Sequence, residues 1–174
     1  MDPFDALGIP PRFSLDLTET EKRYRDLSRA LHPDKYVGRP ASERRMALSK
    51  AIEINEAWRL LRDPARRAEA LFHRAGLDLG EAKAAPVDPE LLMEMMEQRE
   101  ALTEARSSKD RAALDSLLSS MRAREKSVLD RLAAALDATP SDSATLRSNL
   151  PALGELRYVR RFLEEASAAE DELT

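Results

Sequence analysis

One stretch decides the fold of the first half of the chain: KRYRDLSRALHPDKY, residues 22–36. Apolar side chains recur in it at helical spacing, and Pro33 then stops the helix, because a residue before proline avoids the helical conformation. At about 100° per residue the basic side chains fall within about 60° of one another. They form a positive stripe on one helix face: Lys22, Arg25 and Arg29. The stripe leads directly to the corner His32-Pro33-Asp34, which Lys35 follows.

The other residues up to 75 favour a helical hairpin with short helices around it. Asp2-Pro3 starts a short first helix, and Ser42 is the expected N-cap of a long helix that ends at Asp63-Pro64. This long helix carries one continuous apolar face: Ala47, Ala51, Ile54, Trp58 and Leu61. A further short helix follows the proline. We therefore expect two long antiparallel helices that pack through their apolar faces.

The second half of the chain predicts a separate helical domain. Residues 76–88, GLDLGEAKAAPVD, hold two of the five glycines and a proline without a clear period, which is typical of a linker. Asp88 is the expected N-cap of the helix that follows. Helical patterns then occupy three ranges, with one long break at 138–151: 89–106, 109–136 and 151–170. The sequence therefore predicts an all-α fold with a first domain at 1–75 and a three-helix bundle at 89–174.

Composition excludes several classes of function. The chain has 174 residues, a net charge of −4 and no cysteine, which rules out disulfides, thiol nucleophiles and cysteine-based metal ligation. The acidic balance gives no support for nucleic-acid binding. No apolar run approaches the roughly 18 residues of a membrane span, and the first residues lack the pattern of a signal peptide. We expect a cytoplasmic protein that binds neither nucleic acid nor a membrane.

The corner at residues 32–34 has four possible explanations. The simplest is a solvated basic helix face followed by a proline stop. A catalytic pair is a poor alternative, because the intervening proline disfavours a base–acid geometry between His32 and Asp34, and the chain shows no nucleophile or Gly-rich phosphate loop. A metal site is also poor, since the only other histidine, His73, belongs to another helix. The fourth is a rigid, exposed epitope that docks on an acidic partner.

In motif, order and spacing, residues 3–75 resemble the J-domain of DnaJ-type co-chaperones. The resemblance rests on KRYRDLSRALHPDKY together with INEAWRLLRDPARRAEAL, residues 54–71. It implies an antiparallel helical hairpin whose corner and basic face contact a DnaK-type ATPase and stimulate its ATP hydrolysis, without an active site in the J-domain itself. By position, the implied chaperone-binding residues are His32, Pro33 and Asp34 as the trigger, with Lys22, Arg25, Arg29 and Lys35 around it.

The helix expected from residue 89 has two apolar stripes, whereas a bundle helix usually needs one. One stripe suits the core of the bundle: Leu91, Met95 and Leu102. The second is rotated by about 100° or more and is edged with glutamates. Its members are Leu92, Met93 and Met96, with Glu97, Glu100 and Glu104 along the edge. Either both stripes are buried between neighbouring helices, or the methionine-rich stripe is a partly exposed surface that binds a protein.

LLMEMMEQREAL, residues 91–102, together with LRYVRRFLEE, residues 156–165, resembles the C-terminal domain of HscB-type co-chaperones, the J-proteins of iron–sulfur cluster biogenesis. With the J-domain and the linker, this resemblance spans nearly the whole chain. It implies that the bundle holds the cluster scaffold protein IscU and brings it to the specialised chaperone HscA. By position, the implied scaffold-binding residues are Leu92, Met93, Met96, Glu97, Glu100, Glu104 and Tyr158. For the tyrosine, local packing in a Tyr158–Phe162 pair is the alternative.

The resemblance thus predicts a co-chaperone rather than an enzyme. It would stimulate a DnaK/HscA-type ATPase and deliver IscU to it, without a cofactor or metal of its own, because the cluster belongs to the client. An alternative is a J-domain co-chaperone for a different client, which would bind extended apolar peptides and ignore the scaffold. A structural helical protein is a third reading, in which Asp34→Asn changes nothing beyond stability.

Overall fold

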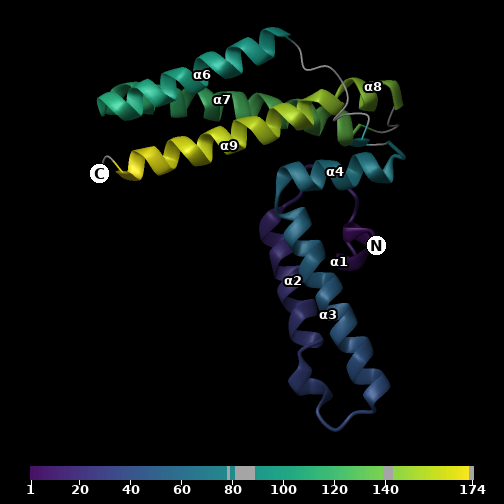
Figure 1. Cartoon of the computed structure of the whole chain (residues 1–174). Coiled ribbons are helices and arrows are strands. Elements are labelled where there is room, and N and C mark those ends of the chain that lie inside the picture. The colour runs from purple at the N-terminus through teal and green to yellow at the C-terminus, as the bar shows by residue number, and fades with distance from the viewer. Residues whose placement is uncertain (78, 81–88, 139–142, 173–174) are drawn as a thin grey trace. The chain divides into compact units, whose positions relative to one another are not determined.

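The computed structural model describes residues 1–77, 79–80, 89–138 and 143–172, and these residues form helices without any β-strand (Figure 1). The chain divides into two compact units. The first contains Met1–Leu77 with the described residues of Leu136–Ser141, and the second contains the described residues of Asp78–Ala135 and Asp142–Thr174. The expected all-α class is confirmed, while the predicted cap at Asp88 lies outside the described residues. Within the described part of the chain, no helix has the length and apolar character of a membrane span.

The first unit is a helical hairpin closed at one end by two shorter helices. Its elements are α1 (Pro3–Leu7), α2 (Leu17–Ala30), the 3₁₀ helix η1 (Pro33–Tyr36), α3 (Ala41–Leu61) and α4 (Pro64–Arg74). Aspartates cap three of the helices by accepting hydrogen bonds from first-turn N–H groups: Asp2, Asp16 and Asp63. The expected cap of α3 at Ser42 is wrong, because this helix already begins at Ala41, after Pro40, and has no side-chain cap. Proline's fixed φ sets the start there instead.

Aromatic contacts hold α2 against α3. The rings of Tyr24 and Trp58 stack with centroids 5.6 Å apart and planes 13° apart. The Tyr24 hydroxyl also donates a hydrogen bond to Asn55 Oδ1 at 3.1 Å. At the closed end of the hairpin, side chains from α1, α3 and α4 form a fully buried core: Phe4, Leu7, Leu61 and Phe72. This core fixes the hairpin, and the corner between α2 and α3 lies at its opposite tip (Figure 1).

The described residues of the second unit include three long helices and one short one. They are α6 (Pro89–Ser108), α7 (Arg111–Leu136), α8 (Ser143–Ser148) and α9 (Leu150–Glu172). The helix α8 falls inside the stretch that was expected to be a break, so that expectation is wrong for these residues. Leu146 of α8 is buried, and this burial supplies the stabilisation that so short a helix lacks on its own.

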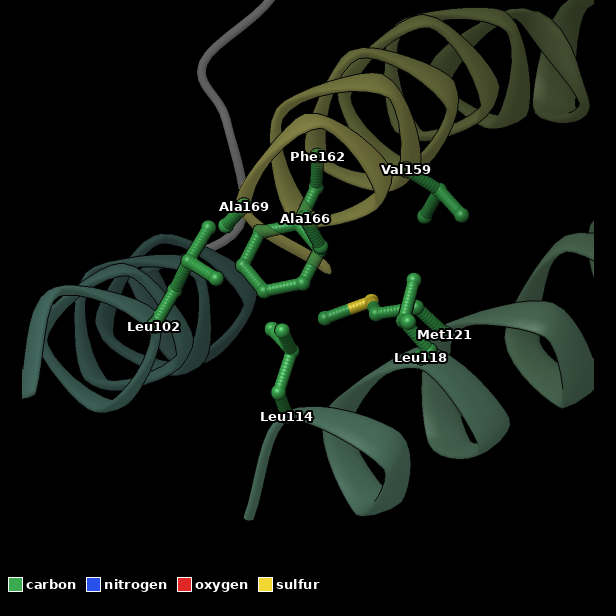
Figure 2. Close-up of a cluster of buried hydrophobic side chains, with 8 residues drawn as sticks. All are labelled: Leu102, Leu114, Leu118, Met121, Val159, Phe162, Ala166 and Ala169. Carbon is green, nitrogen blue, oxygen red and sulfur yellow. The ribbon is translucent and has the colours of Figure 1, made fainter. Parts of the chain in front are cut away.

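One hydrophobic cluster joins α6, α7 and α9 (Figure 2). Its buried members are Leu102, Leu114, Leu118, Met121, Val159, Phe162, Ala166 and Ala169. Between α6 and α7 the chain turns back through Lys109, whose φ of 55° is in the left-handed region. Asp110 then caps α7 by accepting a hydrogen bond from the N–H of Ala113 at 3.0 Å. As a result α7 runs antiparallel to α6, while α9 runs parallel to it (Figure 1).

Candidate functional site

The corner of the first unit is exposed and locally ordered. His32 caps η1, and its Nδ1 accepts a hydrogen bond from the N–H of Asp34 at 3.4 Å. The same Nδ1 lies 3.4 Å from Asp34 Oδ2. One nitrogen cannot serve both contacts in the neutral ring, since the first needs its lone pair and the second needs a proton on it. The side chains are 58% and 85% exposed, so both remain accessible to a partner.

The predicted basic stripe lies on the exposed side of α2, next to this corner. Its side chains are 70%, 62% and 78% exposed: Lys22, Arg25 and Arg29. Each pairs with an acidic residue three or four positions earlier in the helix, at 3.6, 2.6 and 3.9 Å respectively. Exposed pairs of this kind contribute little to stability and exchange readily for other partners. The structure therefore brings the stripe, the corner and the exposed Lys35 together on one helix and the turn that follows it.

The second apolar stripe of α6 is exposed. Its three large apolar side chains are 49%, 63% and 59% exposed: Leu92, Met93 and Met96. The three glutamates along its edge are also exposed: Glu97, Glu100 and Glu104. We call these six residues the α6 strip. A shallow groove of about 500 Å³ continues from it along the helix, lined by Met96, Arg99, Glu100, Thr103, Glu104 and Ser107.

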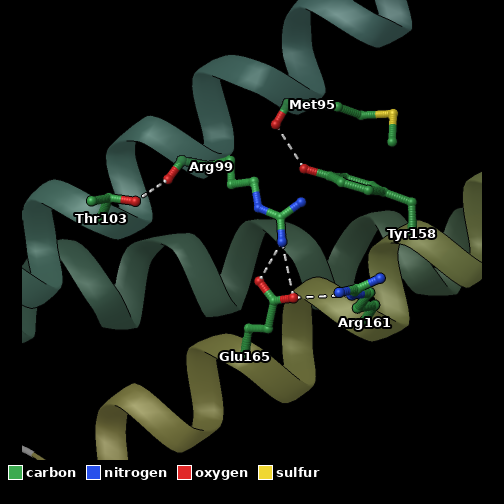
Figure 3. A network of polar contacts seen from close by, with 6 residues as sticks. All are labelled: Met95, Arg99, Thr103, Tyr158, Arg161 and Glu165. Carbon is green, nitrogen blue, oxygen red and sulfur yellow. Dashed lines mark hydrogen bonds and ion pairs between the residues drawn. The ribbon is translucent and has the colours of Figure 1, made fainter.

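Tyr158 is half-buried and packs against the hydrophobic cluster. Its ring centroid lies 6.3 Å from that of Phe162, as the local pairing alternative expected. Its hydroxyl donates a hydrogen bond of 2.8 Å to the backbone carbonyl oxygen of Met95 (Figure 3). Burial raises the pKa of the Tyr158 phenol, which keeps the hydroxyl protonated as a donor.

Two ion-pair groups beside the α6 strip were not anticipated from the sequence. In the first, the Arg124 guanidinium of α7 pairs with Glu94 of α6 and, at 2.9 Å, with Glu155 of α9. The hydrogen bond from Arg124 holds the pKa of Glu94 below its ordinary value. In the second, Arg99 of α6 lies 3.0 Å from both carboxylate oxygens of Glu165 of α9 (Figure 3). Each pair therefore fastens α6 to a neighbouring helix.

Charge is divided unequally between the two halves of the sequence. Residues 1–77 contain 15 lysines and arginines against 12 aspartates and glutamates, whereas residues 78–174 contain 13 against 20. The first half is therefore basic and the second acidic, which agrees with the signs of the basic stripe and the α6 strip. In the described part of the chain, no group of three or more histidine, aspartate or glutamate side chains is arranged to hold a metal ion.

Two protein-family models match the chain. A model described as "DnaJ domain" covers residues 2–70, and one described as "HSCB C-terminal oligomerisation domain" covers residues 87–167. The first match includes the corner and the basic stripe, and the second includes the α6 strip and most of α9. The residues between the two matches, 71–86, include most of the stretch that the sequence predicts to be a linker.

Curated relatives match this chain over nearly its whole length. The co-chaperone protein HscB homolog of Paraburkholderia xenovorans is 33% identical over 162 residues, which cover 93% of this chain and 90% of that protein. The homolog of Burkholderia mallei is 34% identical over 165 residues, which cover 95% of this chain and 91% of the relative.

Two solved structures of HscB proteins match the fold of this chain. The chaperone HscB from Vibrio cholerae matches with a TM-score of 0.85 and 29% identity over 100% of both chains. Human co-chaperone protein HscB matches in fold, with a TM-score of 0.85 and 24% identity over 98% of this chain and 82% of that one. The chain therefore belongs to the HscB family of J-domain co-chaperones, which regulate the ATPase of an Hsp70-type chaperone in iron–sulfur cluster assembly.

Proposed function

We propose that this chain uses its corner and basic stripe to dock on a DnaK/HscA-type ATPase, and its α6 strip to hold an IscU-type scaffold protein. The observation that carries the proposal is the exposure of Leu92, Met93 and Met96 on a helix that already has a separate inner face. Large apolar side chains left about half exposed are suited to burial by a partner. Their glutamate edge favours a partner with basic residues around an apolar centre.

The corner supports the ATPase half of the proposal by its shape and exposure. Pro33 restricts the backbone, while His32 and Asp34 present a ring nitrogen and a carboxylate to the solvent. A site of this kind can stimulate hydrolysis by binding one conformation of the ATPase more tightly than another. Because the scaffold is held by the same chain, its encounter with the ATPase becomes intramolecular and its effective concentration rises.

Steady-state ATP hydrolysis by an HscA-type chaperone tests the proposal, with this chain and an IscU-type scaffold added separately and together. We expect the chain and the scaffold together to raise the rate of ATP hydrolysis by more than the sum of their separate effects. Two variants should abolish this synergy in different ways. Asp34→Asn should still bind the scaffold but no longer stimulate the ATPase. The triple variant Leu92→Ala/Met96→Ala/Glu100→Ala should still stimulate the ATPase alone but no longer respond to the scaffold.

A matched control for the scaffold arm is Leu48→Ala/Ile52→Ala/Glu53→Ala on α3. Its two apolar side chains are 55% and 60% exposed, similar to those of the α6 strip. This control should bind the scaffold as the unaltered chain does. Stimulation that depends on Asp34 but ignores the scaffold would favour the alternative of a different client. Stimulation that survives Asp34→Asn would contradict the assignment of the corner.

A further inference from the structure

The half of α6 that carries most of the α6 strip has little hydrophobic anchoring. Residues 89–101 are all described, and none of them is buried; the first buried side chain of the helix is Leu102. The inner side of this half includes Gln98, whose Oε1 is buried without a hydrogen-bond partner among the described residues. A buried acceptor without a partner opposes close packing. The inner side therefore holds this half less firmly than Leu102 and Ala105 hold the other.

Polar contacts to both neighbouring helices hold the first half of α6 in place. Arg124 of α7 pairs with Glu94 and also with Glu155 of α9, so that one guanidinium joins all three long helices. The Arg124 and Glu155 side chains are 24% and 12% exposed and are shielded from water, while Glu94, the member of the group on α6, is 46% exposed. Arg99 is fastened to Glu165 of α9 by two contacts of 3.0 Å. The shielded contact between Arg124 and Glu155 is stronger than an isolated surface pair, whereas the Arg99–Glu165 pair, with side chains 54% and 37% exposed, is a weaker tie to α9.

Helical geometry places these contacts on opposite flanks of α6. Glu94 and Arg99 are about 140° apart around the helix axis, with the inner side between them. On that inner side the Met95 carbonyl accepts the hydrogen bond from Tyr158. The α6 strip occupies the remaining outer arc. Contacts on both flanks oppose rotation of the helix about its own axis in either direction. Figure 3 shows the Arg99 flank and the central hydrogen bond from Tyr158, which holds α6 against α9.

We propose that Tyr158, Arg124 and Arg99 are positioning residues that fix the orientation of the first half of α6 and so present the α6 strip in a single arrangement. This role differs from direct contact with the scaffold. Its consequence for binding rests on the proposed function, whereas the positioning itself is a property of this chain alone. Because the strip is already held in one arrangement, this segment loses less conformational entropy when a partner binds.

Hydrogen–deuterium exchange of the full chain tests the positioning. Tyr158→Phe keeps the ring and removes only the hydroxyl, and Arg99→Gln removes the second tie. The expected result is faster exchange of the amides in residues 90–101, by about 3- to 10-fold for the loss of one such hydrogen bond. Amides around the buried cluster, at 114–121 and 159–166, should keep their rates. Uniform acceleration across the unit, or none in 90–101, would overturn the proposal.

Arg161→Gln is the matched control for Arg99→Gln. Arg161 pairs with the same Glu165 at 3.1 Å, but from one turn away within α9. Its loss removes a charge and an ion pair from the same carboxylate without removing a tie to α6. Exchange in residues 90–101 should therefore remain unchanged. Acceleration equal to that of Arg99→Gln would show that local charge, rather than a tie between helices, controls this segment and would overturn the assignment.

Titration of a purified IscU-type scaffold provides the binding arm. Tyr158→Phe and Arg99→Gln should each weaken its affinity by about 2- to 5-fold, a fraction of the effect on exchange, because the strip itself is intact. Arg161→Gln should leave the affinity unchanged. If the unaltered chain fails to bind the scaffold, the proposed function fails, but the exchange arm still decides the positioning. If exchange is faster and affinity is unchanged, positioning of the strip for this partner is refuted.

Discussion

Replacing Leu92 and Met96 together by alanine is expected to weaken scaffold binding without destabilising the chain. The two side chains are 49% and 59% exposed, so about half of each is available for burial by a partner. Burial of a whole side chain of this size contributes about 1.5–3 kcal/mol, and the exposed parts therefore contribute about 0.7–1.8 kcal/mol each. After allowance for the carbon that alanine keeps, the pair should lose about 1.2–2.4 kcal/mol, or roughly an 8- to 60-fold increase in Kd.

Isothermal titration calorimetry with the scaffold measures this change, and urea unfolding of the free chain measures its stability. Because both side chains project from the outer face of α6, the free energy of unfolding should change by no more than about 0.5 kcal/mol. The double variant Leu48→Ala/Ile52→Ala provides a control of similar exposure on α3. A Kd within twofold of the unaltered chain would refute the reasoning. So would a loss of stability above about 1 kcal/mol, since it would show that the strip is needed for the fold.

Three further changes test the bundle. Phe162→Ala removes a ring that is only 3% exposed and should lower the unfolding free energy in urea by about 3–5 kcal/mol; a loss below 1 kcal/mol would contradict its place in the core. Lys109→Gly relieves about 1–2 kcal/mol of strain at a φ of 55°, against about 0.4–1 kcal/mol for the greater freedom of glycine in the unfolded chain, so that free energy should rise by up to about 1 kcal/mol; a lower urea midpoint would show that the turn carries no strain. Because Arg124 holds the pKa of Glu94 below its ordinary 4.5, the stabilisation from this carboxylate is complete above that value and is lost as the pH falls through the lower folded-state pKa. Glu94→Gln should therefore differ from the unaltered chain at neutral pH and converge with it in acid, and a difference independent of pH would argue against the pair.

The positions of the helices in the first unit were predictable because their signals are local. Asp2 and Asp16 cap their helices, and Pro33 stops α2, through contacts within a few residues that need no tertiary partner. The sequence pattern did not predict a helix whose formation depends on tertiary packing. The helix α8 is six residues long and rich in serine and threonine, and its order depends on burial of Leu146 against the rest of the unit.

The candidate site shows the same division between local and tertiary information. Helical periodicity identified a second stripe on α6, but only the packed bundle shows that the stripe faces outward. The hydrogen bond from Tyr158 ends on a backbone carbonyl, which carries no signature in the sequence. The ion pairs between α6 and α9 do have a signature in the sequence. Arg99 and Arg106 are seven residues apart, and so are their partners Glu165 and Glu172. A search for charge pairs with a common heptad spacing would have found them.

The parallel pairing of α6 with α9 has a consequence for synthesis of the chain. Residues paired across these helices are 66 positions apart, as in Arg99–Glu165. A ribosome adds about 5–20 residues per second, so α6 is made roughly 3–13 s before its partner. During that interval the inner stripe and the α6 strip are both open to solvent on one methionine-rich helix. A nascent segment with exposed apolar surface is prone to non-native contacts, so α6 is vulnerable to aggregation until α9 has been made.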